Sequence, residues 1–138
     1  MGIIKNILLY LWQLPQNFIG LILIIGAKKY KWFGYTFYTK KQFFNAGVTL
    51  GNYIILDEVF VRVGGKTLLD TLKHEVGHKK QSEMLGIMYL LIIGIPSFLI
   101  NIYDRIFHKK WLLTDRKNWY YKQFPENWAD KLGGVERG

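Results

Sequence analysis

The 138-residue chain contains no cysteine. Disulfide bonds and thiolate metal sites are therefore excluded, so that histidine, aspartate or glutamate must hold any metal ion. Histidine is itself scarce, with three residues. The chain has ten acidic residues and nineteen lysines and arginines. A cluster that combines histidines with carboxylates would therefore use a large share of the metal-ligating side chains in this sequence.

The chain is also too short for a second domain, and residues 1–138 are predicted to form a single one. Its formal net charge of +9 could indicate nucleic acid as a partner. However, the basic residues flank two apolar runs and do not form one polar tract, as Lys28, Lys29, Lys31, Arg105, Lys109 and Lys110 show. This placement favours an anionic membrane surface, such as the cytoplasmic face of a bilayer, and we expect no nucleic-acid partner.

The first apolar run covers residues 1–27 and is interrupted by the polar stretch 13–17, which contains Pro15. Its total length suffices for the helix of about 20 residues that crosses a bilayer. The interruption predicts either a kinked span or two shorter helices lying in the membrane interface. A cleaved signal peptide is the alternative, because Lys5 precedes an apolar core and Gly26–Ala27 offers small residues.

The second apolar run, residues 84–103, carries no charged side chain. This favours a membrane segment, with a core helix of a soluble domain as the alternative. Gly94 and Pro96 divide the run into halves of about three turns each, and a proline at this place kinks or ends a helix.

Aromatic and β-branched residues with intervening turn formers fill residues 30–63. This composition predicts short strands within 30–40, 47–56 and 58–63, with turns near 40–41, 45–47 and 51–52. Together with the helices predicted on either side, these strands indicate an α+β fold with a small antiparallel sheet.

Directly after these strands comes HEVGH, an HExxH motif from His74 to His78, on a predicted helix over residues 67–83. Thr67 and Asp70 form a capping signature after Gly64–Gly65, and a stripe of Leu68, Leu72 and Val76 predicts the buried face. Histidines four residues apart on a helix share a face, so that both rings can reach one metal ion, by default zinc. Glu75, at the edge of that face, is in the position of a general base that activates water.

Near the C-terminus, residues 125–134 read PENWADKLGG, in which Glu126 and Asp130 share the face of a predicted helix. An HExxH motif followed by a helix with ExxxD resembles the gluzincin metallopeptidases, which include thermolysin-like enzymes and several integral-membrane proteases. The resemblance implies that Zn²⁺ is bound by His74, His78 and Glu126. It also implies that Asp130 accepts a hydrogen bond from a ligand histidine and that Glu75 activates the water.

The family's residue that stabilises the transition state, a histidine or tyrosine, has no counterpart here at a fixed spacing. His108, Tyr120 and Tyr121 are the available candidates. Ligation by His108 is a weaker hypothesis, because an isolated histidine beside membrane-flanking cations is typically interfacial.

The implied ligands lie on both sides of the second apolar run, and a straight crossing of the bilayer would separate them by about 30 Å. We therefore expect a re-entrant hairpin that turns back near residues 94–96 and leaves residues 74–78 and 126–130 on the same side. The alternatives are that the run lies in the interface or in the protein core, or that Glu126 is not a ligand.

The sequence thus predicts a small membrane-associated zinc metallopeptidase that hydrolyses peptide bonds, with its active site on the cytoplasmic side. Its expected partners are a peptide or protein substrate and the lipid bilayer, and the sequence specifies neither the substrate nor the oligomeric state. One alternative is a non-catalytic membrane protein stapled by zinc, either a scaffold or a peptide-binding pseudoenzyme. Another is a basic membrane-binding module without a metal.

Overall fold

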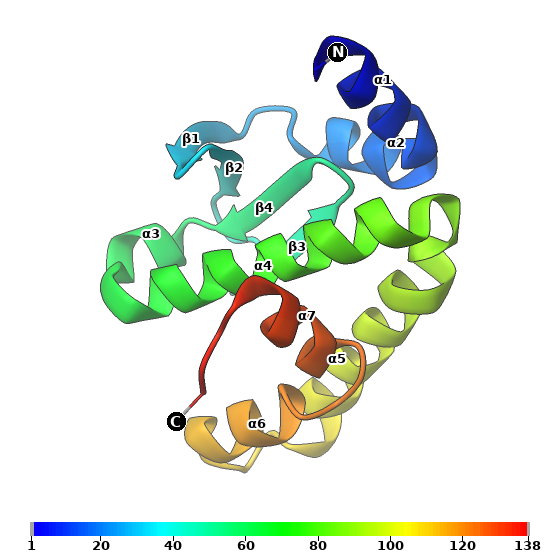
Figure 1. The fold of residues 1–138 in the computed structure, drawn as a ribbon. Coiled ribbons are helices and arrows are strands. Elements are labelled where there is room, and N and C mark those ends of the chain that lie inside the picture. Colours follow the sequence, from blue (N-terminus) through cyan, green and yellow to red (C-terminus); the bar gives the residue numbers. More distant parts are fainter. Residues whose placement is uncertain (1, 138) are drawn as a thin grey trace.

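A computed structural model of the chain describes residues 2–137 (Figure 1). The elements follow in the order α1 (Gly2–Trp12), α2 (Leu14–Leu23), β1 (Lys28–Trp32), β2 (Tyr35–Lys40), β3 (Gly47–Leu50), β4 (Tyr53–Asp57), α3 (Val59–Val63), α4 (Gly65–Leu85), the 3-10 turn η1 (Gly86–Met88), the π-helical turn η2 (Leu90–Gly94), α5 (Ile95–Phe107), α6 (Leu113–Tyr120) and α7 (Glu126–Gly133). The predicted α+β class is confirmed.

The four strands form one sheet in the order β1-β2-β4-β3. The pairs β1–β2 and β3–β4 are antiparallel, whereas β2 and β4 are parallel. The prediction of a purely antiparallel sheet is therefore wrong. After β2 the chain passes to the far edge of the sheet to form β3, and β4 returns between the two, so that it runs in the direction of β2.

Residues 58–63, predicted as a strand, form helix α3 from Val59 onward. Asp57 at the end of β4 explains this difference. Its carboxylate accepts hydrogen bonds from the backbone N–H of Val59 at 3.0 Å and of Asn45 at 2.8 Å. These bonds turn the chain out of the sheet, and local hydrogen bonding then overrides the β propensity of the valines.

Helix α4 contains the whole HEVGH motif and packs across the sheet. Leu72 and Val76 lie in one buried cluster with Phe37, Ile54 and Leu56, which confirms the predicted apolar stripe. The helix begins at Gly65, two residues before the predicted start, and Asp70 forms an ion pair with Lys66 in place of a capping box. The face of α4 opposite the sheet carries α7 (Figure 1).

The first apolar run forms the two short helices α1 and α2, as one of the alternatives predicted, and their position in the membrane interface stays a prediction. The polar residues that interrupt it are buried. Ser82 on α4 donates a hydrogen bond to Gln13 at 2.6 Å and accepts one from Gln16 at 3.0 Å. Asn17 accepts a bond from the backbone N–H of Asn52 at 2.7 Å. The interruption therefore attaches both helices to α4 and to the β3–β4 turn.

The second apolar run does not turn back near residues 94–96, so the predicted hairpin is wrong. Leu90–Phe107 is one helical stretch of 18 residues, long and apolar enough by length and composition to cross a membrane, and 11% of it is buried. The chain reverses earlier, at Gly86, whose φ of 56° suits glycine. Pro96 follows the π-helical turn η2, where the regular α-helical hydrogen-bond pattern is already interrupted, so the helix tolerates its missing N–H donor.

Candidate metal centre

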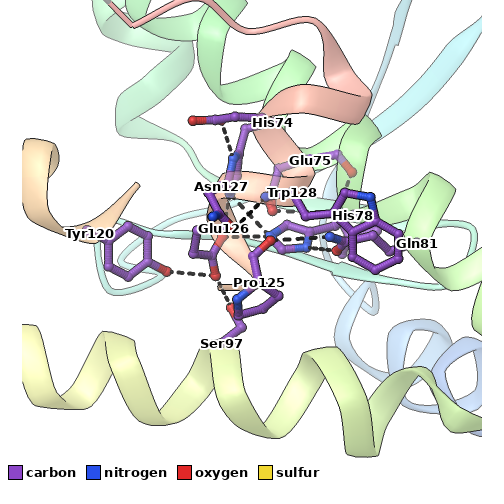
Figure 2. A network of polar contacts seen from close by, with 12 residues as sticks. His74, Glu75, His78, Gln81, Ser97, Tyr120, Pro125, Glu126, Asn127 and Trp128 are labelled. Carbon is purple, nitrogen blue, oxygen red and sulfur yellow. Dashed lines mark hydrogen bonds and ion pairs between the residues drawn. The ribbon is translucent and has the colours of Figure 1, made fainter. Parts of the chain in front are cut away.

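His74 and His78 on α4 meet Glu126, the first residue of α7 (Figure 2). Oε2 of Glu126 lies 2.7 Å from Nε2 of His74 and 2.8 Å from Nε2 of His78, and the two nitrogens are 3.1 Å apart. The three side chains are 6%, 5% and 0% exposed. They form a buried group that could hold a metal ion, as the sequence predicted for these residues.

Glycines allow the two helices to come this close. A Cβ atom added to Gly77 on α4 would overlap the backbone carbonyl of Ala129, and one added to Gly133 on α7 would overlap that of Lys73. Only residues without a side chain fit at these two positions. Gly77 inside HEVGH is therefore required for the close packing of α4 against α7.

Hydrogen bonds behind the histidines fix which nitrogen faces the centre. Nδ1 of His74 lies 2.7 Å from Oδ1 of Asp130, and Nδ1 of His78 lies 2.7 Å from Oε1 of Gln81. Both partners accept, so each Nδ1 donates a proton to its partner, and each Nε2 faces Glu126 and offers a lone pair to a metal once the ring has lost its second proton. The contact of Asp130 agrees with the sequence expectation, whereas Gln81 was missed although it follows His78 by three residues on the same helix.

The donor set fits a divalent cation. When the rings are deprotonated, two ring nitrogens and a carboxylate oxygen direct lone pairs at one point, so a cation can replace the protons that the histidines share with Glu126. Ligands of a tetrahedral zinc with bonds of about 2.0–2.1 Å lie about 3.3 Å apart, so the separations of 2.7, 2.8 and 3.1 Å within the group would each increase by about 0.2–0.6 Å.

The electrostatics of the group agree with this fit. Burial alone would raise the pKa of Glu126, but the positive potential of His78 and the hydrogen bonds from both histidines hold it well below its usual range. Glu126 is therefore an anion despite its burial. The pKa of Asp130 is also lowered, because the hydrogen bonds from His74 and Arg137 outweigh burial.

The second oxygen of Glu126 is held from the other side. Oε1 accepts a hydrogen bond from the hydroxyl of Ser97 on α5 and one of 3.2 Å from the hydroxyl of Tyr120 (Figure 2). These contacts leave Oε2 for the histidines. Ser97 could not be found by motif, and its signal in the sequence is a hydroxyl inside an otherwise apolar run.

Glu75 lies beside the group and is not part of it. Its side chain is 3% exposed, and the hydroxyl of Thr49 on β3 lies 3.5 Å from its Oε1. Burial raises the pKa of the Glu75 carboxyl, and the potentials of His78 and His74 oppose that increase. The Glu75 carboxylate lies close to the His–His–Glu group but contacts Thr49 on β3, so it can exchange a proton without serving as a ligand.

Of the remaining candidates, Tyr120 is the one whose hydroxyl contacts a member of the group. The ring of Tyr121 packs edge-on against His74, with the ring centres 5.1 Å apart. His108 belongs to a separate cluster, in which Asp104 accepts hydrogen bonds from its Nδ1 at 2.8 Å and from Arg116 at 2.9 Å. Ligation by His108 finds no support in this geometry.

Fold and site together define an α+β protein with a buried His–His–Glu group. Comparison of the chain with family models, with curated proteins and with solved structures finds no match.

Proposed function

We propose that this chain is a small membrane-associated zinc peptidase of the gluzincin type. The observation that carries the proposal is the convergence of His74, His78 and Glu126, with Asp130 behind the first histidine and Glu75 at the side. This is the arrangement that the HExxH and ExxxD motifs imply. A catalytic zinc takes three protein ligands and keeps one position open for water or substrate.

Zinc bound at this group would supply a Lewis acid that acidifies a water molecule and polarises a peptide carbonyl. Glu75 would take the proton of the attacking water and deliver it to the leaving amine. Burial raises its pKa above the ordinary value, which favours acceptance of a proton from water. Tyr120 is assigned to hydrogen bonding with the substrate carbonyl oxygen, since its hydroxyl already lies beside Glu126.

The same proposal places the protein at a membrane, with the active site on the cytoplasmic side. The support is the uncharged stretch 84–103, whose side chains are largely exposed, and the basic residues that border the apolar runs. A peptide or protein is the proposed substrate, because strand β3 lies at the edge of the sheet next to Glu75, where an extended chain can pair with it.

The variant Glu75→Gln tests the mechanism. We expect it to bind zinc with the parental stoichiometry and to lose peptide hydrolysis by at least about 100-fold, because the general base is removed while the ligands stay. Glu83→Gln is the matched control, with the same change on the same helix at a side chain that pairs with Lys79. Cleavage at the parental rate by Glu75→Gln would refute the assignment.

A non-catalytic zinc protein is the second candidate, and one observation favours it. The three group members and Glu75 are all buried, so that a substrate needs an opening to reach them. In that case zinc would only join α4 to α7. The zinc-loaded parent would then bind the metal with full occupancy and cleave no more peptide than Glu75→Gln.

A further inference from the structure

The free edge of the sheet carries an acceptor directly beside the proposed general base. In the β3–β4 ladder Leu50 pairs with Tyr53 across the two-residue turn, and Val48 pairs with Ile55. Antiparallel pairs alternate between bonded and non-bonded positions, so the backbone groups of Thr49 point away from β4, toward the outer edge of the sheet, where other elements cover Thr49 to 2% exposure. The Thr49 hydroxyl in turn donates to the backbone carbonyl of Glu75 at 3.0 Å.

A side chain from the second apolar run occupies this acceptor. The hydroxyl of Tyr89, which lies between η1 and η2, donates to the backbone carbonyl of Thr49 at 2.9 Å. Tyr89 is 3% exposed. An extended peptide that pairs with β3 would offer a backbone N–H to the same carbonyl. Tyr89 therefore takes the place of the peptide and must move before a substrate can pair.

The segment that carries Tyr89 has an apolar outer surface. Its outward side chains are at least 38% exposed, and they are Ile87, Met88, Leu91 and Ile92. A π-helical turn such as η2 is a frequent feature of functional sites, and the positive φ at Gly86 marks the start of the segment. The element that closes the edge of β3 is thus the one that exposes apolar side chains.

This apolar surface continues over neighbouring elements. Helices α1 and α2 contact η1, and α2 also contacts β3. On α5 the polar residues Ser97 and Asp104 bond to Glu126 and Arg116 inside the protein, whereas Phe98 and Leu99 are 64% and 57% exposed. An amphipathic helix of this kind lies in a membrane interface with its apolar face in lipid. The edge of β3, which Tyr89 closes, therefore lies next to elements of the proposed lipid-facing surface.

We propose that the substrate is a membrane-anchored protein, whose extended segment reaches β3 from the lipid-facing surface by displacing Tyr89 from the Thr49 carbonyl. The inference rests on the proposed function for the reaction, and on the free edge and Tyr89 for the access route. Apolar side chains suit the segment, because α2 contacts both β3 and η1, and α2 and η1 expose apolar groups. A peptide free in water lacks this route.

Photo-crosslinking of the full-length Glu75→Gln variant tests the route without hydrolysis. The protein is bound to vesicles of phosphatidylcholine and phosphatidylglycerol. One probe is a peptide with a lipid-embedded helix of about 20 residues followed by an extended segment that contains photo-leucine. The other is the same extended segment without the helix. We expect the anchored probe to crosslink to residues 47–50 and to Tyr89. The soluble probe should give at least roughly tenfold less crosslinked product at these residues.

Tyr89→Phe in the same background removes the hydroxyl that competes for the Thr49 carbonyl. We expect crosslinking of the anchored probe at residues 47–50 to rise about fivefold, because the loss of one neutral hydrogen bond shifts the equilibrium between Tyr89 and the probe by about this factor. Tyr103→Phe is the matched control, because Tyr103 lies on α5 with its side chain 48% exposed. No change with Tyr89→Phe, or an equal change with Tyr103→Phe, would overturn the role of Tyr89.

The outcomes separate the access route from the reaction. Equal crosslinking by both probes, or crosslinks outside β3 and Tyr89, would overturn the route. If the zinc-loaded parent cleaved the soluble segment as fast as the anchored segment, the route would also be overturned, but the peptidase activity would be supported. Crosslinks on β3 without cleavage by the zinc-loaded parent would support the route and overturn the hydrolase.

Discussion

Asp130 joins the candidate metal centre to the end of the chain. One of its oxygens faces Nδ1 of His74 at 2.7 Å, and Arg137 donates to both oxygens at 2.7 and 3.0 Å. The guanidinium of Arg137 also lies 3.4 Å from the centre of the Tyr121 ring. A short C-terminal segment thereby fixes the orientation of a proposed ligand through one carboxylate.

Replacing Asp130 by alanine is expected to weaken zinc binding by about 10- to 100-fold, because His74 loses the acceptor that orients its ring. A chelator-competition titration measures the affinity. Asp115→Ala is the control, since Asp115 is exposed in the first turn of α6. Equal zinc affinities of the parent and Asp130→Ala would contradict the orienting role.

Zinc binding is expected to strengthen as the pH rises. Burial alone would lower the pKa of His74, but hydrogen bonds to Asp130 and Glu126 outweigh burial and raise the pKa to about 10. The protonated ring therefore stabilises the metal-free fold fully below the ordinary pKa of 6.5, and this contribution is lost as the pH rises through about 10. The metal requires the deprotonated ring, so zinc affinity should increase across that interval.

Chelator-competition and denaturant titrations at several pH values within this interval measure both effects. We expect zinc affinity to rise and the free energy of unfolding of the metal-free protein to fall. A zinc affinity that does not change with pH would show that His74 is not a ligand.

The group of His74, His78 and Glu126 was predictable, because two spaced motifs encode it. Gln81, Ser97 and Arg137 were not. Gln81 lies one helical turn from His78 but belongs to no motif, whereas Ser97 and Arg137 act through contacts that only the folded chain creates. Gln81 is one glutamine among several, and Ser97 lies in a run whose composition indicates lipid contact. Hydrogen bonds between residues distant in the sequence leave no spacing signal.

The packing of α4 against α7 brings the ligands together at the scale of elements. The two helices approach at Gly77 and Gly133, where any Cβ would meet a backbone carbonyl. Backbone atoms cannot rotate away as a side chain can. The distance between the histidines and Glu126 therefore depends on these glycines as well as on the ligand residues.

Gly77→Ala should lower the free energy of unfolding by about 1–3 kcal/mol or more and weaken zinc binding in parallel, because α7 must move away. Gly94→Ala is the control, since its Cβ would meet Leu90 at an ordinary 3.4 Å. Thermal or denaturant unfolding and zinc titration of both variants provide the comparison. A Gly77→Ala protein with parental stability and affinity would exclude close packing at this position.

Two element predictions were wrong for the same physical reason. The valines of residues 58–63 have high β propensity, yet hydrogen bonds to Asp57 start α3 there. The chain was expected to turn back near Pro96, yet the helix continues past it after the π-helical turn η2. In both cases the local context of one residue decides the outcome, and composition over a window does not contain that context.

At the scale of the whole molecule, the exposed apolar side chains gather on α1, α2, η1, η2 and α5, while the sheet lies on the other side of α4 from α5 and α7 (Figure 1). The described residues of these apolar elements are charged only at Lys5, Asp104 and Arg105. This asymmetry supports a protein that lies on one leaflet with the proposed metal centre just above the lipid.

Phe98→Glu should reduce binding to vesicles that contain phosphatidylglycerol by about tenfold or more, because one large side chain no longer enters the lipid. Phe33→Glu is a strict control, since Phe33 is 85% exposed on the β1–β2 turn, away from the apolar elements. Sedimentation with vesicles measures the bound fraction. Equal losses for both variants would indicate a general charge effect and contradict the proposed orientation.

The most direct test of the account is an anomalous-difference map at the zinc absorption edge, from crystals of the zinc-loaded protein. The account predicts one peak, about 2.0–2.2 Å from Nε2 of His74, Nε2 of His78 and a carboxylate oxygen of Glu126. A zinc ion bound elsewhere, or bound by the histidines without Glu126, would contradict it.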